Sequence, residues 1–179
     1  MYKVVVLIVA LFAVANAVPS AYDTEQVWRA GNLSYSVPST AILGGYDPYG
    51  YGTYVGRVKA GNDILPARIL VETGTAYYNT ETASGKSLIY DFLVAERNVR
   101  YVWQRSFDGF YEKNAVAVGT TSKNELVYIC RSKSDGGILI GTLFLRTKMC
   151  IIKHDNLSLQ KFSKYEVLVA QPKSNGTFY

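Results

Sequence analysis

The feature that most constrains this fold is an internal duplication at a spacing of 74 to 75 residues. Identical residues recur in the same order in both halves, and the clearest pairs are Trp28 and Trp103, Gly45 and Gly119, Tyr54 and Tyr128, and Arg57 and Arg131. A repeat of this length is one supersecondary unit that buries its apolar face only against a neighbour. The sequence therefore predicts two repeats, residues 28–95 and 103–170, packed together about a pseudo-twofold axis.

Both repeats have the residue pattern of β-strands. Runs of β-branched and aromatic residues are separated by Gly, Asn and Asp, and no segment has convincing helical periodicity. Strands are expected at 53–59, 67–72, 75–79 and 88–95, and at 126–133, 142–146, 149–153 and 165–171, with matching turns at 61–63 and 135–137. The expected fold is all-β, with or without strands exchanged between the repeats, and residues 171–179 form a C-terminal tail.

The N-terminus has the pattern of a signal peptide. Lys3 is followed by an apolar run of eleven residues from Val4 to Val14, and small residues precede Val18. A membrane anchor is the alternative, but this run is much shorter than the roughly 20 apolar residues that span a bilayer. Residues 1–17 are therefore expected to be removed, giving a product without a membrane span that is secreted or stored in vesicles.

Secretion changes what the two cysteines and the sequons mean. Cys130 and Cys150 can form a disulfide in an oxidising compartment if their strands are neighbours, and two buried thiols are the equally open alternative. Asn32, Asn156 and Asn175 each begin an Asn-X-Ser/Thr sequon, which is compatible with glycosylation of surface loops.

The sequence at 44–47, 54–57, 64–68 and 90–94 resembles the DM-nine repeat family. These segments read Gly-Gly-Tyr-Asp, Tyr-Val-Gly-Arg, Ile-Leu-Pro-Ala-Arg and Tyr-Asp-Phe-Leu-Val, in the order and spacing of the family's motifs. The resemblance covers nearly all of the chain after residue 17. It implies an all-β tandem-repeat fold and, as in some relatives, a mannose-binding lectin of innate immunity that recognises microbial glycans.

The resemblance also implies a sugar site. The family's acidic residue after Gly-Tyr corresponds to Asp47, and its lysine position is occupied by Arg68. A carboxylate accepts hydrogen bonds from sugar hydroxyls, a cation donates to them, and an aromatic residue such as Tyr46 covers an apolar sugar face. The alternative is structural, with Asp47 capping a turn and Arg68 a charge on a surface strand.

The second repeat departs from this pattern. Its equivalent residues are Thr121 and Thr142, so at most one charged site per chain is expected. The family's Gly-Lys-Glu-His segment is also changed, to 85–88 Gly-Lys-Ser-Leu and 159–162 Leu-Gln-Lys-Phe. Both repeats therefore lack that carboxylate and imidazole, which points to a weak site or a different ligand.

Other functional classes find little support in the residues. The single histidine, His154, is expected in a turn and has no evident partner base or nucleophile, so an enzyme is not expected. The aspartates are scattered without metal-loop spacing, so neither a metal nor another cofactor is expected. Loss of Lys3 with the leader would lower the formal net charge from +5 to +4. This charge is dispersed, and stretches such as 161–164 are expected to be solvated strand edges, so no nucleic-acid partner is predicted.

Two functions remain open from the sequence. The first is a secreted lectin for mannose-type glycans or microbial polysaccharide, with weak single sites that gain avidity through a homodimer. The second is a secreted or vesicular protein-interaction or structural module without affinity for sugars.

Overall fold

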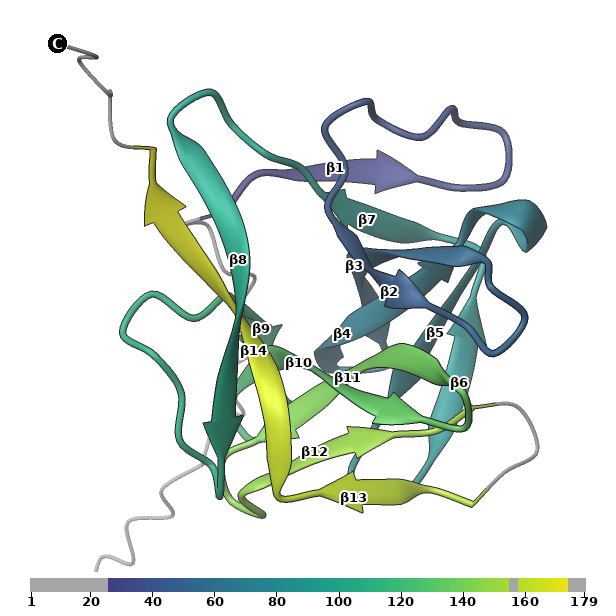
Figure 1. The fold of residues 1–179 in the computed structure, drawn as a ribbon. Coiled ribbons are helices and arrows are strands. Elements are labelled where there is room, and N and C mark those ends of the chain that lie inside the picture. Colours follow the sequence, from purple (N-terminus) through teal and green to yellow (C-terminus); the bar gives the residue numbers. More distant parts are fainter. Residues whose placement is uncertain (1–25, 155–157, 174–179) are drawn as a thin grey trace, which may run out of the picture.

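The computed structural model describes residues 26–154 and 158–173, which are nearly all in antiparallel β-structure (Figure 1). The predicted leader at 1–17 and the sequons at Asn156 and Asn175 lie outside the described residues. Asn32 is described, and its side-chain oxygen accepts a hydrogen bond from the Ser34 N–H at 2.8 Å. Within the described ranges, no helix has the length and hydrophobicity needed to cross a bilayer.

Each half of the chain contributes seven strands to the described structure. The first half contains β1 (Trp28–Gly31), β2 (Leu43–Tyr46), β3 (Gly52–Ala60), β4 (Asp63–Leu70), β5 (Thr75–Asn79), β6 (Ser84–Ser87) and β7 (Tyr90–Leu93), with a 3₁₀ turn, η1, at Val71–Thr73. The second half contains β8 (Val99–Phe107), β9 (Ala117–Thr120), β10 (Leu126–Ser134), β11 (Gly137–Phe144), β12 (Met149–Ile152), β13 (Gln160–Phe162) and β14 (Lys164–Pro172). The all-β prediction is therefore confirmed.

Two of the predicted strands begin too late. β4 and β11 start at Asp63 and Gly137, directly after two-residue turns, rather than at 67 and 142. In the second turn, Asp135 and Gly136 both have positive φ, as a tight hairpin requires. In the first repeat, Pro66 argued against a strand that starts at Asp63, because proline cannot donate a backbone hydrogen bond to a neighbouring strand. It is accommodated because β4 pairs with β3 at this point, whereas its pairing with β5 begins only at Ala67.

The two halves have the same strand pairing. In the first, β3, β4, β5 and β6 form an antiparallel meander, and β7 returns to pair with both β3 and β1. In the second, β10, β11, β12 and β13 form the same meander, and β14 pairs with β10 and β8. β14 extends to Pro172, so the first two residues of the predicted tail belong to a strand.

The halves are joined across the pseudo-twofold axis. β2 pairs with β11 at Tyr46 and Ile138, whereas β1, β7, β8 and β14 stay with their own halves, so pairing between the repeats is confined to this junction among the described strands. At the axis, Tyr101 Oη donates a hydrogen bond to Gln26 Oε1 at 2.8 Å. These two residues are themselves equivalent at the 75-residue spacing, as expected for positions beside a twofold axis.

An arginine in each repeat reaches across to the other. Arg57 donates to the Val118 carbonyl at 3.4 Å, and Arg131 donates to the Gly44 carbonyl at 2.8 Å. Val118 and Gly44 are also equivalent positions, so the two contacts are related by the pseudo-twofold axis. They bind the two halves through reciprocal hydrogen bonds.

Each of these arginines is held in the same way. The Arg57 guanidinium lies 4.5 Å from the Trp28 ring centroid and 2.9 Å from the Asp91 carboxylate. Arg131 lies 4.2 Å from the Trp103 ring and 2.7 Å from Glu166. Around them, residues of both repeats form one apolar cluster, which includes Val55, Leu93, Ile129 and Leu168. The repeated Trp and Arg therefore mark the interface between the repeats.

The second repeat alone contains a disulfide. Cys130 on β10 and Cys150 on β12 are bonded, with their Cα atoms 6.0 Å apart. Both strands flank β11, so the sheet must curl strongly to bring them together. The first repeat has Gly56 and Ala76 at the equivalent positions, and Gly56 is packed so closely that an added Cβ would lie 2.3 Å from the Ile69 side chain.

Candidate functional site

Two of the three residues predicted for a sugar site, Asp47 and Arg68, line a small pocket between the repeats. The pocket has a volume of about 200 Å³ and is lined by Asp47, Tyr49, Tyr51, Thr53, Arg68, Leu70, Tyr77 and His154. Seven of these residues come from the turn between β2 and β3 and from β3, β4 and β5. His154 follows β12 and is the contribution of the second repeat.

Asp47 is held by the turn that it begins. Its Oδ1 accepts hydrogen bonds from the N–H groups of Tyr49 and Tyr51, both at 2.9 Å. The side chain caps the turn, as the structural reading expected, and it also lines the pocket with only 5% of the residue exposed. Among the described residues no hydrogen bond uses Oδ2, which leaves this oxygen able to accept from a ligand.

Arg68 lies in the middle of β4 and is 3% exposed. It is therefore a buried cation, and the expectation of a charge on a surface strand is wrong. Its guanidinium carbon lies 5.1 Å from the centroid of Tyr77, which is its register partner on β5. The Lys86 ammonium lies at the same distance from that ring. Tyr77 thus helps to position Arg68, because an aromatic face attracts cations.

Two further polar residues were not predicted for this site. Thr53 is fully buried on β3, and its hydroxyl has no hydrogen-bond partner in the described structure. His154 was expected in a turn; it lies after β12, is 8% exposed and forms part of the pocket wall. A buried hydroxyl without a partner is costly, so Thr53 is a further group that a polar ligand can satisfy.

Tyr46 does not line the pocket. It is 43% exposed at the end of β2, where it pairs with Gly52 and Ile138. Neighbouring residues of an extended chain point in opposite directions, so Tyr46 and Asp47 do not face the same space. The aromatic surface of the pocket comes instead from Tyr49, Tyr51 and Tyr77.

The equivalent position in the second repeat is built differently. Thr121 caps its turn through weaker contacts, at 3.3 Å from the Lys123 N–H and 3.4 Å from the Glu125 N–H. Thr142 is fully buried and donates to the Asn79 carbonyl at 3.1 Å. The charged pair is therefore found in the first repeat and is replaced by hydroxyls in the second.

No group of three or more His, Cys, Asp or Glu side chains suited to a metal ion occurs in the part of the chain that the structure describes. The residues that line the pocket offer a ligand hydrogen-bonding groups and aromatic rings. Direct hydrogen bonds and ring contact are the chemistry that these residues provide.

The fold defines an all-β protein made of two tandem repeats. A family model described as the DM9 repeat matches residues 47–161, well over half of the sequence, and the chain belongs to this family. This confirms the predicted resemblance to the DM-nine repeat. A search of the curated proteins finds no match to the chain.

Among solved structures, the chain is similar to the crystal structure of the nematode sperm cell motility protein MFP2B. The TM-score is 0.64 at 14% sequence identity, and the match covers 87% of this chain. It covers 49% of the MFP2B chain, so the present chain spans about half of that protein's length. At this identity, the likeness establishes a shared fold.

Proposed function

We propose that this protein is a secreted, non-enzymatic lectin that binds mannose-type glycans in the Asp47 pocket and recognises microbial surfaces in innate immunity. The proposal is supported by membership of the DM9 repeat family. The resemblance to this family implies that Asp47 and Arg68 stand at its acidic and basic sugar-binding positions. The observation that carries it is that Asp47 and Arg68 line one pocket, although 21 positions separate them in the sequence.

The pocket has the groups that a sugar requires. Asp47 Oδ2 can accept a hydrogen bond from a hydroxyl while Oδ1 continues to hold the turn. Arg68 can donate to a hydroxyl oxygen, and Thr53 can do either. The three tyrosines supply ring surface for the apolar face of the sugar.

The size of the pocket favours one sugar residue. Its volume of about 200 Å³ is below the roughly 300 to 1,000 Å³ that is typical of sites for drug-sized ligands. A site for a single sugar has few contacts and therefore low affinity. A homodimer that presents two such pockets would raise the apparent affinity for a polysaccharide through avidity.

The test is binding of the chain from Val18 to Tyr179 to mannan and to a glycan array, with and without EDTA. Asp47→Asn is the sharpest variant, because the remaining amide oxygen can still cap the turn whereas Oδ2 is replaced by a donor. Thr121→Ala is the matched control at the equivalent turn. We expect mannan binding that survives EDTA, persists in Thr121→Ala and is lost in Asp47→Asn.

A protein-interaction module is the second candidate. It is favoured by the exposed tyrosines Tyr46, Tyr49 and Tyr51, because tyrosine is enriched in protein interfaces. If the folded chain binds no glycan on the array, the lectin proposal fails and this second function becomes the better account.

A further inference from the structure

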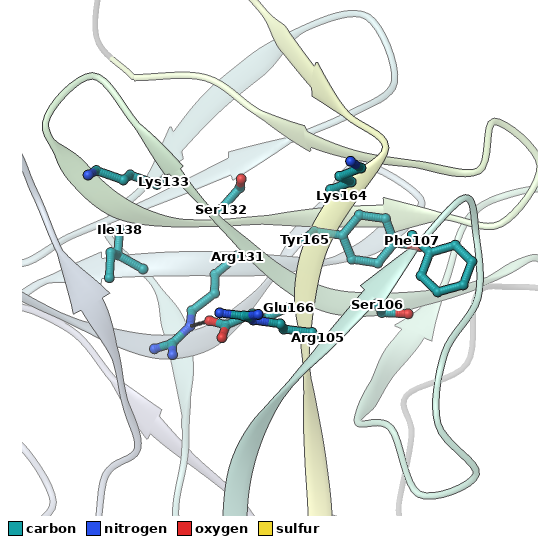
Figure 2. Close-up of a pocket in the computed structure, with 10 residues that line it drawn as sticks. All are labelled: Arg105, Ser106, Phe107, Arg131, Ser132, Lys133, Ile138, Lys164, Tyr165 and Glu166. Carbon is teal, nitrogen blue, oxygen red and sulfur yellow. Dashed lines mark hydrogen bonds and ion pairs between the residues drawn. The ribbon is translucent and has the colours of Figure 1, made fainter.

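A larger groove lies in the second repeat, away from the Asp47 pocket. It has a volume of about 550 Å³ and is formed by residues of β8, β10, β11 and β14 (Figure 2). The two cavities have no lining residue in common. Four cationic side chains line the groove, from Arg105, Arg131, Lys133 and Lys164, together with one carboxylate, from Glu166.

The groove exists because two strands part from each other. β10 and β14 pair only at Cys130 with Val167 and at Arg131 with Glu166. Beyond this point β10 stays with β11 as far as Ser134, while β14 stays with β8 as far as Lys164. Lys133 and Lys164, the next residues on the same face, are left on opposite sides of the opening.

Strand register arranges the charges in two rows. In the first row, Glu166 lies between Arg131, to which it is bonded, and Arg105, its register partner on β8. In the second row, the inner residues are Lys133 and Lys164, and their outer register partners are Ile138 and Phe107. In the view of Figure 2, Lys133 and Lys164 lie on opposite sides of Ser132, and the two arginines lie below it beside Glu166.

Three of these cations form no ion pair among the described residues, although Arg105 neighbours Glu166. Within the described chain, the side chains of Arg105, Lys133 and Lys164 have no hydrogen-bond or ion-pair partner, and all three residues are exposed. Like charges around one cavity repel each other, and an anion in the cavity relieves that repulsion. The groove is therefore complementary to a ligand with more than one negative charge.

The first repeat has the same opening without this charge. β3 and β7 also pair at only two positions, and the groove beyond them has a volume of about 390 Å³. Arg57, Asp91 and Lys59 are retained there, but Ala30 takes the place of Arg105 and Ile89 the place of Lys164. The fold thus requires the opening but not the additional cations of the second repeat.

The charged groove is also lined by apolar side chains. Phe107 is 60% exposed, and its ring stacks on Phe110 with the centroids 6.2 Å apart. Tyr165 is buried in the lining, where its hydroxyl donates to the Phe110 carbonyl and accepts from the Gly109 N–H. Ile138 provides apolar surface across the opening. A ligand here would contact a hydrophobic surface as well as cations.

We propose that this groove binds an acidic saccharide, with one sulfate, phosphate or carboxylate group between Lys133 and Lys164 and another near Arg105. The apolar faces of the sugar rings would lie against Phe107 and Ile138. The volume is within the range of sites that enclose ligands of a few rings, so a short oligosaccharide fits better than a long polymer.

The test is calorimetric titration of the chain with a heparin-derived tetrasaccharide at about 0.15 M salt, where distant charges are screened. The key variant, Arg105→Ala with Lys164→Ile, gives the second groove the first repeat's residues at these two positions. Both positions are exposed, so the fold should survive. We expect at least a tenfold loss of affinity in this variant and no change in Lys59→Ala, the matched control in the first groove.

Other arms of the experiment separate the possible ligands. A neutral tetrasaccharide should not bind, and Asp47→Asn should bind the acidic one normally, which keeps this result independent of the mannose site. An equal loss of affinity in Lys59→Ala would overturn the proposal, because binding would then reflect general electrostatic attraction to the positive charge of the protein. Equal competition by inorganic sulfate or by single-stranded DNA would also overturn it, because the saccharide would have no special fit.

Discussion

The turns at Asp47 and Thr121 show what the two repeats share and what they do not. In each turn the first residue's N–H donates to a carbonyl four residues later at 2.9 Å, to Tyr51 in one case and to Glu125 in the other. Each first side chain accepts N–H groups two and four residues later. A threonine hydroxyl is sufficient to cap this turn. The Asp47 carboxylate is therefore not required to cap the turn, and its second oxygen takes part in no hydrogen bond among the described residues.

The partner positions differ more strongly than the turns. Arg68 and Thr142 are both buried, but Arg68 has Tyr77 beside it, whereas Thr142 bonds to a carbonyl of the other repeat. Tyr77 corresponds to Ile151, which cannot attract a cation in the same way. The first repeat thus contains a polar site where the second contains packed core.

Introducing the buried arginine of the first repeat at the equivalent position of the second should strongly reduce the stability of the fold. Thr142→Arg places a cation in the core with no carboxylate at position 121, so we expect a loss of about 4 kcal/mol in the free energy of unfolding. Urea denaturation measures it. Adding Thr121→Asp should recover part of the loss, and an unchanged stability of Thr142→Arg alone would show that the second site accommodates a buried charge.

The disulfide is a second difference between the repeats. Replacing Cys130 and Cys150 by alanine removes a cross-link that encloses about twenty residues, and we expect the free energy of unfolding to fall by about 3 kcal/mol. Thermal denaturation under oxidising conditions compares the variant with the native chain. If addition of a reductant destabilises both proteins equally, the cross-link is not the cause of the difference.

The reciprocal arginines offer a finer comparison. Arg131→Ala removes an ion pair at 2.7 Å and a hydrogen bond across the interface at 2.8 Å, so we expect a loss of about 2 kcal/mol. Arg57→Ala should cost less, because the corresponding contacts measure 2.9 and 3.4 Å. Chemical denaturation of both variants tests the order. The reverse order would mean that these distances do not govern the strength of the interface.

The smallest predicted effect concerns the axis, where Tyr101 meets Gln26. Burial, and secondarily Glu96, raises the pKa of the Tyr101 phenol to about 12. Between pH 10 and 12 the unfolded chain loses this proton first, so stability present below pH 10 falls as the pH rises. Because solvent screens part of this effect for a half-buried phenol, we expect a loss of only about 0.5 kcal/mol from this residue between pH 9 and 11. Tyr101→Phe should reduce the measured pH dependence of the unfolding free energy.

Much of the fold could be predicted because its determinants are local or repeated. Alternating apolar residues identify strands, and the matched Trp and Arg identify equivalent positions. The strands that were placed too late show where this approach fails. Pro66 signals a break in an isolated sequence, and only the missing pairing of β4 with β5 at that residue explains why a strand can contain it.

The site was only partly predictable. Asp47 and Arg68 were found through the family pattern, but His154 was not, because its place in the pocket depends on how the second repeat packs against the first. Tyr46 does not line this pocket for a simpler reason, since it neighbours Asp47 and points elsewhere. Lys164 is exposed at the start of β14, as expected for a solvated strand edge. Its position opposite Lys133 follows from the parting of two strands, which no local pattern reports.

His154 belongs to the second repeat but forms part of the wall of the first repeat's pocket. Mutations in one repeat can therefore affect the site of the other. In a symmetric pair of identical subunits, one substitution alters both copies of every site at once. In this fused duplication, a substitution at Arg68 leaves Thr142 untouched, while a change at His154 affects the pocket of the opposite half. Because both repeats are part of one chain, the sites of the two repeats can acquire different ligands independently. Each repeat nevertheless remains part of the environment in which the other evolves.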